Sequence, residues 1–307
     1  MVLDTKDENF SEISDETFRI LEKERVEVSK KISNLFKTFI ISSSVFLILS
    51  LFCLVKYDSG LLFFILFALN LVLYEIIEKK IVKNIRLKFK KEVICKIIKS
   101  INPKFVYIMD KHISKNEILK TGILDIKNCG FFSGNDLISG VIDSVKFRMS
   151  DICYEENRQT GNGSIRISIF KGIVFVADFY KNFNSHTFII SSNYTKKKGQ
   201  KITLDNVNFN SKFQVFTDNK INAFYILDPV FMEKILKLTN KFQNIDMVFY
   251  KNKIYCFINN NKDNFEIDID TPLLNAKMIF SLYKYNFDMF FGIVKELNLN
   301  NKIFKKS

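Results

Sequence analysis

Two nearly uncharged apolar stretches near the N-terminus limit the possible folds of this chain more than any other feature. Residues 38–55 hold no charged side chain, and residues 61–77 hold only Glu75, close to their end. At a rise of about 1.5 Å per residue, roughly 18 helical residues span about 27 Å, which is close to the thickness of a bilayer core. Residues 56–60 form a short, turn-rich connection, so residues 38–77 predict an antiparallel transmembrane hairpin. A buried hairpin of a soluble protein and a cleaved signal peptide both fit two successive runs poorly.

Basic residues around the two stretches predict the orientation of the chain. Residues 78–101 are strongly basic, and the flank before the first stretch carries Lys30, Lys31 and Lys37, whereas the connection carries only Lys56. Cytoplasmic flanks of membrane helices carry an excess of lysine and arginine, so we expect both termini in the cytoplasm. The residues that we expect to face the membrane surface and its anionic headgroups are Lys79, Lys80, Lys83, Arg86, Lys88, Lys90 and Lys91.

Residues 78–101 are expected to continue the second membrane helix as a basic juxtamembrane helix. Apolar side chains recur in it every four residues, at Ile81, Ile85, Phe89, Val93 and Ile97. The helix either lies against anionic lipids or is a cytoplasmic flank whose apolar stripe packs on the preceding helix, and the second interpretation is favoured. Nucleic-acid binding is not expected, because exposed aromatic residues are not interleaved with the lysines and no known module is present.

Two polar residues, Asn70 and Glu75, fall inside the second apolar stretch. Polar groups inside a membrane carry out a function or hold helices together. We expect Asn70 to bond to serines 42–44 of the first stretch or to a second copy of the chain. We expect Glu75 to reach the cytoplasmic headgroups beside Lys79.

Residues 1–37 predict a cytosolic N-terminal segment with a helix over residues 14–36. Ser14 is a suitable N-cap residue, and Asp15 and Glu16 follow it at the positive end of the helix dipole. This helix would lead directly into the first apolar stretch.

Asn102-Pro103 breaks the basic helix and begins a soluble domain over residues 102–307. Apolar runs predict strands over residues 165–170, 173–179, 186–190, 202–204 and 213–216, and a β-hairpin with arms 247–250 and 254–258. Because most strands are separated by short turns, the expected fold class is α+β with antiparallel strands and a long C-terminal helix.

Helix starts and one glycine complete this pattern. Ser114 begins a capping box, Asp228 precedes Pro229 as an N-cap, and residues 276–297 form the long last helix. Gly172 marks either a tight turn, which is favoured, or a bulge or close backbone approach.

Five blocks of the soluble domain resemble a known family. They are GNDLISG at residues 134–140, IFKGIVFVADF at 169–179, FQVFTD at 213–218, YILDP at 225–229 and KIYCFI at 253–258. In order and spacing they are similar to the bacterial "domain of unknown function 3137" family, and the paired apolar helices ahead of them match too. Asn135 stands where the family pattern has an acid, and Phe224 where it has arginine. The resemblance implies an inner (cytoplasmic) membrane location in a bacterium and this architecture, and it implies no activity.

Candidate catalytic residues are few. His112 and His186 are the only histidines of the chain, and His186 would form a dyad with Asp178 if their strands pair. No serine lies in a nucleophile elbow, and the five cysteines fit neither a disulfide framework nor a zinc pattern.

An acidic cluster at Asp151, Glu155 and Glu156 suggests a cation site. Its spacing departs from that of an EF-hand loop, so a solvated acidic loop is the preferred interpretation. No metal or cofactor is therefore expected.

The leading hypothesis is a non-enzymatic, membrane-anchored cytosolic module that binds another protein, a peptide or lipid headgroups. Its expected partners are the bilayer with its anionic headgroups and a protein partner or a second copy of the chain. The alternative is a hydrolase-like enzyme at the inner membrane with dispersed catalytic residues, in which a deep pocket would collect Asp178, His186 and Glu156.

Overall fold

The computed structural model describes residues 15–57, 59–126, 130–161, 163–191, 199–242, 244–267, 269–270, 272–273, 276–297 and 299. The chain divides into two compact units. The first combines Met1–Ser100 with Glu266–Tyr283, and the second combines Ile101–Phe265 with Lys284–Ser307. The sequence did not predict that Glu266–Tyr283 would join the N-terminal helices. Ser14, the expected N-cap, lies outside the described residues.

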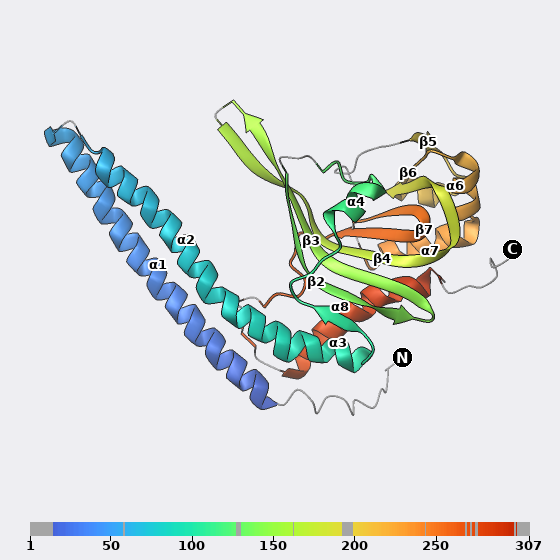
Figure 1. The fold of residues 1–307 in the computed structure, drawn as a ribbon, viewed down its shortest axis with the longest axis horizontal. Helices are drawn as coiled ribbons and strands as arrows, with labels where there is room; N and C mark the ends of the chain where they lie inside the picture. Colours follow the sequence, from blue (N-terminus) through green and yellow to red (C-terminus); the bar gives the residue numbers. More distant parts are fainter. Residues whose placement is uncertain are drawn as a thin grey trace. The chain divides into compact units, whose positions relative to one another are not determined.

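The first unit is built on two long helices that run side by side in opposite directions (Figure 1). Helix α1 covers Asp15–Tyr57, so the two predicted segments on either side of residue 37 form one helix. Helix α2 (Leu61–Phe89) continues through a π-helical turn, η2 (Lys90–Ile94), into α3 (Cys95–Ile101), as expected for the basic segment. Gly60 at the connection is required by space, since a Cβ there would lie 2.5 Å from the carbonyl oxygen of Ser50.

The segment Glu266–Tyr283 is tied to the two helices by charged and backbone groups. Arg25 of α1 donates to the carbonyl oxygen of Ile269 at 2.6 Å, and Glu22 accepts from the backbone N–H of Leu273 at 2.8 Å. Phe89 of α2 contacts the ring of Tyr283, with centroids 5.6 Å apart. These contacts join parts of the chain that are far apart in sequence into one unit.

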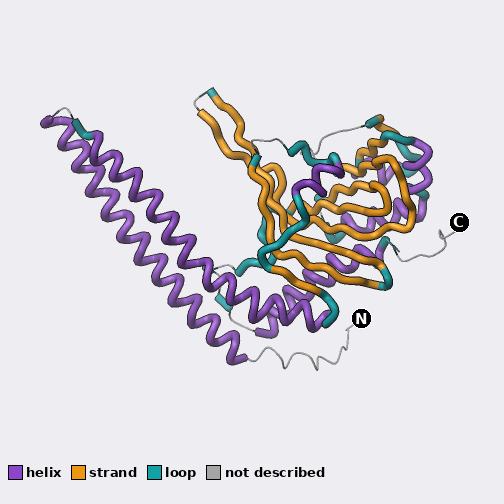
Figure 2. Tube along the Cα trace, in the orientation of Figure 1, coloured by secondary structure: helices purple, strands orange, loops and turns teal. Residues whose placement is uncertain are grey.

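The second unit is an antiparallel sheet, as the sequence predicted. Its order is β1-β2-β3-β4-β6-β5, and β7 also pairs with β4. The strand bounds are Val106–Ile108 for β1, Phe131–Ile142 for β2, Val145–Thr160 for β3, Gly163–Ile190 for β4, Gln200–Ile202 for β5, Gln214–Thr217 for β6 and Ile245–Asn259 for β7. Figure 2 shows the strands in orange.

Strand β4 organises this sheet. Three of the predicted strands, over residues 165–170, 173–179 and 186–190, are parts of this one 28-residue strand. It pairs with β3, β7 and β6 in succession. The preferred prediction of a tight turn at Gly172 is wrong, because Gly172 lies inside β4 with φ 155°. A Cβ there would lie 2.1 Å from the carbonyl oxygen of Ile258, so the alternative of a close backbone approach is confirmed.

The predicted β-hairpin within residues 247–258 is confirmed. Figure 1 shows β7 turning back on itself, and Lys251 at the turn has φ 54°. At the open end the backbone N–H of Asn259 donates to the carbonyl oxygen of Asn244 at 3.1 Å, and each arm also pairs with a different part of β4. The register shifts between the pairs Asp178↔Lys253 and Phe183↔Lys251, so the extra residues bulge from β4. The local turn signal of Lys251, Asn252 and Lys253 is therefore correct, and β4 pairs with both arms of the hairpin that it forms.

Helices cover both faces of the sheet. Successive side chains of a strand point to opposite faces, so the central strands supply apolar residues to both. One face holds Val174, Val176 and Phe257 together with Ile118 of α4 (Lys115–Thr121). On the other face Phe175 and Phe147 stack with centroids 5.7 Å apart, and Phe147 contacts Phe291 of α8 (Ala276–Glu296).

The remaining helices begin where the sequence places caps. Ser114 accepts from Glu117 N–H before α4, and Asp228 accepts from Phe231 N–H before α7 (Pro229–Thr239), as predicted. Helices α5 (Val207–Lys212) and α6 (Lys220–Ile226) are capped by Asn206 and Asn219.

Candidate functional site

The apolar surface of the paired helices is the candidate functional feature of the first unit. Two helices in the described residues, Glu16–Tyr57 and Leu61–Ile101, are long and apolar enough to cross a membrane. Their most apolar windows are only 6% and 0% buried, which is unlike the core helix of a soluble protein. Side chains such as Val55 (86% exposed) and Leu61 (69% exposed) point away from the unit. The helices therefore present an uncovered apolar surface in the described part of the chain.

Asn70 joins the two helices through hydrogen bonds, as predicted. Its Nδ2 donates to the Oγ atoms of Ser42 and Ser43, each at 2.8 Å. Those serines lie on α1, so the N–H donors of an amide that would be costly to leave unpaired in an apolar setting are satisfied within the pair.

The basic residues after the second apolar stretch divide into two groups. Lys79, Lys80, Lys83 and Lys91 are exposed, and Lys79 lies 3.2 Å from Glu75 in the arrangement expected for that carboxylate. Arg86, Lys88 and Lys90 instead pair with acidic residues of the first unit.

Lys90 corrects the prediction of a membrane-facing row of cations. It is only 4% exposed, and its Nζ lies 2.6 Å from Glu266 Oε1. Arg86 Nε lies 3.3 Å from the other oxygen of the same carboxylate. Burying an ammonium group requires an opposite charge nearby, and the sequence could not show that a residue so distant in the chain would supply it.

The predicted dyad of His186 and Asp178 does not form. His186 Nδ1 lies 3.1 Å from Asp218, its Nε2 lies 3.2 Å from the carbonyl oxygen of Lys120, and its ring stacks on Tyr250. Asp178 instead accepts from Lys253 Nζ at 2.7 Å. The two strand segments do belong to one strand, but each side chain has a different partner.

The acidic cluster is not a solvated loop. Asp151, Glu155 and Glu156 lie in β3, and Asp151 and Glu156 are buried. Glu156 accepts from the hydroxyl of Tyr154 at 2.6 Å. Burial raises the pKa of Asp151 well above its usual range, and the charge of Asp263 adds to this, while hydrogen bonds from Asn264 act in the opposite direction.

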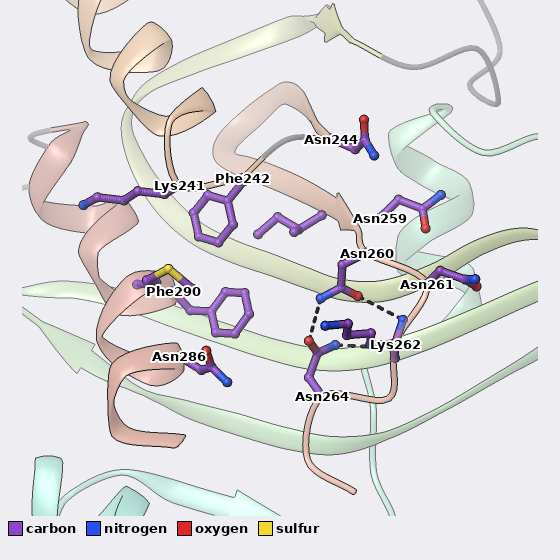
Figure 3. Close-up of a pocket in the computed structure, with 12 residues that line it drawn as sticks. Lys241, Phe242, Asn244, Asn259, Asn260, Asn261, Lys262, Asn264, Asn286 and Phe290 are labelled. Carbon is purple, nitrogen blue, oxygen red and sulfur yellow. Dashed lines mark hydrogen bonds between the residues drawn. The ribbon is translucent and has the colours of Figure 1, made fainter. Parts of the chain in front are cut away.

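A pocket of about 600 Å³ opens between α8 and the loop that follows β7 (Figure 3). Its lining is rich in asparagine, with Lys241, Phe242, Asn244, Ile258, Asn259, Asn260, Asn261, Lys262, Asn264, Asn286, Met289 and Phe290. Figure 3 shows Phe242 and Phe290 on one side and the loop with Asn260, Lys262 and Asn264 on the other. The sequence pattern did not predict this site, although asparagine is frequent directly after β7.

Hydrogen bonds hold the loop of this pocket in place. Asn264 donates to the buried Asp151 through its backbone N–H at 2.9 Å and its Nδ2 at 2.7 Å, and it accepts from Asn260 Nδ2 at 2.6 Å. The backbone N–H of Asn261 donates to the carbonyl oxygen of Lys171 on β4 at 2.9 Å. Gly172 permits this close approach of the loop to β4.

The chemistry of the pocket favours binding. Among the described residues that line it there is no carboxylate, histidine or cysteine, so its side chains supply neither an anionic metal ligand nor a nucleophilic thiol. A smaller pocket of about 190 Å³ nearby contains Cys153 and Asp151. Burial raises the pKa of the Cys153 thiol, which keeps it in the unreactive protonated form.

The fold defines the class of the protein as an antiparallel α+β domain on a chain that begins with two long apolar helices. Residues 168–299 match the family model described as a protein of unknown function (DUF3137), which confirms the resemblance seen in the sequence. The pocket lies within this matched segment, and the paired helices lie outside it. No curated protein matches the chain in sequence. In structure the chain is similar to the crystal structure of the mycobacterial trehalose monomycolate transport factor A, TtfA, with a TM-score of 0.36 and 11% identity, over 66% of this chain and 92% of that chain.

Proposed function

We propose that the chain is a membrane-anchored binding module. Helices α1 and α2 cross the cytoplasmic membrane of a bacterium as a hairpin, both chain termini lie in the cytoplasm, and the sheet unit binds its ligand there. The observation that carries the proposal is the uncovered apolar surface of the two helices. Transfer of one such leucine-sized side chain out of water is worth about 1.5–3 kcal/mol, so the surface favours hydrocarbon strongly.

Two further features support this arrangement. The interhelical bonds of Asn70 satisfy the N–H donors of its amide without water. The exposed cations Lys80, Lys83 and Lys91 lie after the second apolar stretch, whereas the connection between the helices carries only Lys56. The proposed partners of these cations are anionic headgroups on the cytoplasmic face.

Binding is supported better than catalysis by the site geometry. The hydrolase alternative needed Asp178, His186 and Glu156 around one pocket, and these three side chains bond to Lys253, Asp218 and Tyr154 respectively. The asparagine-rich pocket offers hydrogen bonds and positive charge instead. A protein partner or a second copy of the chain on the sheet unit stays part of the proposal.

Membrane fractionation and site-directed labelling test the proposal. We expect the full-length chain to stay in the membrane pellet after an alkaline carbonate wash. In a variant without native cysteines, Ser59→Cys at the connection should react with an impermeant maleimide in intact cells. A cysteine placed at Lys262 should react only after the cells are opened. A chain that remains in the supernatant without detergent, or the reverse labelling pattern, would contradict the proposal.

A further inference from the structure

We infer that the pocket between α8 and the loop of residues 259–264 binds a phosphorylated polyhydroxyl compound. This is the shared chemistry of a free sugar phosphate and of the sugar-phosphate headgroup of a lipid. The inference deepens the binding role proposed above and rests on it. The pocket volume of about 600 Å³ accommodates a molecule of that size.

Positive charge is the first feature that selects this ligand. Lys262 is exposed and forms no ion pair within the described residues, so its ammonium group is available to an anion. Lys241, at the other side of the pocket, shares its charge with Glu296 at 3.0 Å. With no carboxylate in the described lining to repel it, a phosphate is favoured beside Lys262.

Amide groups are the second feature. The side chains of Asn244, Asn261 and Asn286 have no hydrogen-bond partner in the part of the chain that the structure describes, and all three line the pocket. Each amide offers two N–H donors and one carbonyl acceptor. A hydroxyl group both donates and accepts, so these amides match a row of hydroxyls better than they match a purely acceptor ligand.

The apolar part of the lining sets the third condition. Phe242 and Phe290 stack on each other with centroids 5.6 Å apart and planes at 16°, and both are buried. Their faces are therefore not free to sandwich a flat base. Together with Ile258 and Met289 they form a shallow apolar wall that suits the C–H face of a sugar ring.

The loop is already ordered for binding. Asn260 and Asn264 bond to each other, and Asn264 is held by the buried Asp151. Asn261 has φ 54°, a left-handed conformation that its backbone bond to Lys171 maintains. The entropic cost of ordering the loop when a ligand binds is therefore small.

Calorimetry on the purified full chain in mild detergent tests the inference without requiring a membrane. The probes are glucose 6-phosphate, glucose and inorganic phosphate. A second arm uses the chain in phosphatidylcholine nanodiscs with and without phosphatidylinositol 4-phosphate, and measures whether that lipid protects a cysteine introduced at Asn286 from a maleimide. Binding of glucose 6-phosphate supports a free ligand, and protection by the phosphorylated lipid alone supports a headgroup.

Matched variants connect the signal to this pocket. Lys262→Gln and Asn286→Ala should each lower the affinity about tenfold or more, the factor expected for one lost hydrogen bond to a charged or buried group. Lys220→Gln and Asn208→Ala, on exposed positions of α6 and α5, should leave the affinity unchanged. Thermal unfolding of all four variants checks that they fold.

Two outcomes would overturn the inference. Inorganic phosphate that binds as tightly as glucose 6-phosphate would show a simple anion site. Absence of binding in both arms, with folded protein, would show that the pocket does not take this chemistry. Because the detergent experiment does not depend on membrane insertion, failure of the pocket is distinguishable from failure of the proposed anchor.

Discussion

Lys90 Nζ lies 2.6 Å from Glu266 Oε1, and this ion pair connects the π-helical turn after α2 with a segment from the far end of the chain. Lys90 is buried, so the pair is not a surface ion pair that water could replace. The ion pair with Glu266 explains why Lys90 is buried while its basic neighbour Lys91 is exposed.

Glu266→Gln should destabilise the first unit by about 3–5 kcal/mol, because it leaves the buried Lys90 ammonium without its opposite charge. Thermal unfolding of the full chain in detergent measures the effect. The double variant Lys90→Met with Glu266→Gln removes both charges and should recover most of the loss. A single variant as stable as the wild type would contradict the role of this pair.

Asn70→Leu should weaken the packing of α1 on α2 by about 1 kcal/mol, since it removes the amide that bonds to Ser42 and Ser43. The readout is the yield of a disulfide crosslink between cysteines introduced on the two helices, together with the unfolding midpoint. Leu71→Ala, at an exposed apolar position, is the control. Equal crosslinking in Asn70→Leu and the control would show that the amide does not hold the helices together.

Gly172→Ala should destabilise the sheet unit by about 1–3 kcal/mol and displace the pocket loop. Its φ of 155° and the 2.1 Å approach to the Ile258 carbonyl oxygen leave no room for a Cβ. Gly161→Ala is a matched control, because a Cβ at that position meets nothing within 4 Å. Unfolding midpoints compare the two variants, and equal midpoints would refute the steric argument.

The pH dependence of stability should report on Asp151. Burial raises the pKa of this carboxyl in the folded state, so the folded chain binds more protons than the unfolded chain between the two pKa values. The contribution of Asp151 is therefore most favourable below the unfolded pKa of about 3.9, and it declines as the pH rises through the folded pKa. Asp151→Asn cannot ionise and should lose this decline.

Unfolding free energies of the wild type and Asp151→Asn, measured in detergent from acid to neutral pH, check the prediction. The difference between the two proteins removes the contribution of all other titrating groups. A difference that does not change with pH would contradict a raised pKa for Asp151.

Local signals in the sequence predicted those elements whose determinants lie close together in the chain. The two apolar helices, the caps at Ser114 and Asp228, the C-terminal helix and the antiparallel class are all confirmed. Even the bonds of Asn70 to the serines of α1 were expected, because an apolar environment leaves an amide few other partners.

Features that depend on distant partners were missed. The hairpin turn at Lys251 and Asn252 was predicted, but the sequence did not show that one long strand, β4, would pair with both of its arms. The burial of Lys90 depends on Glu266, and the burial of Asp151 depends on Asn264. The pocket combines residues of β7, its following loop and α8, so no local motif marks it.

The long strand β4 also has a consequence for the order of events during synthesis. Gly172 pairs with Asn259, and Ile189 pairs with Met247, so the central strand has no complete set of neighbours until β7 has left the ribosome. Such distant pairings form slowly, since the intervening chain must close a large loop first. The helical hairpin, in contrast, needs only the first hundred residues. If the hairpin inserts as proposed, the nascent chain is tethered to the bilayer before the last strand of its sheet has been synthesised.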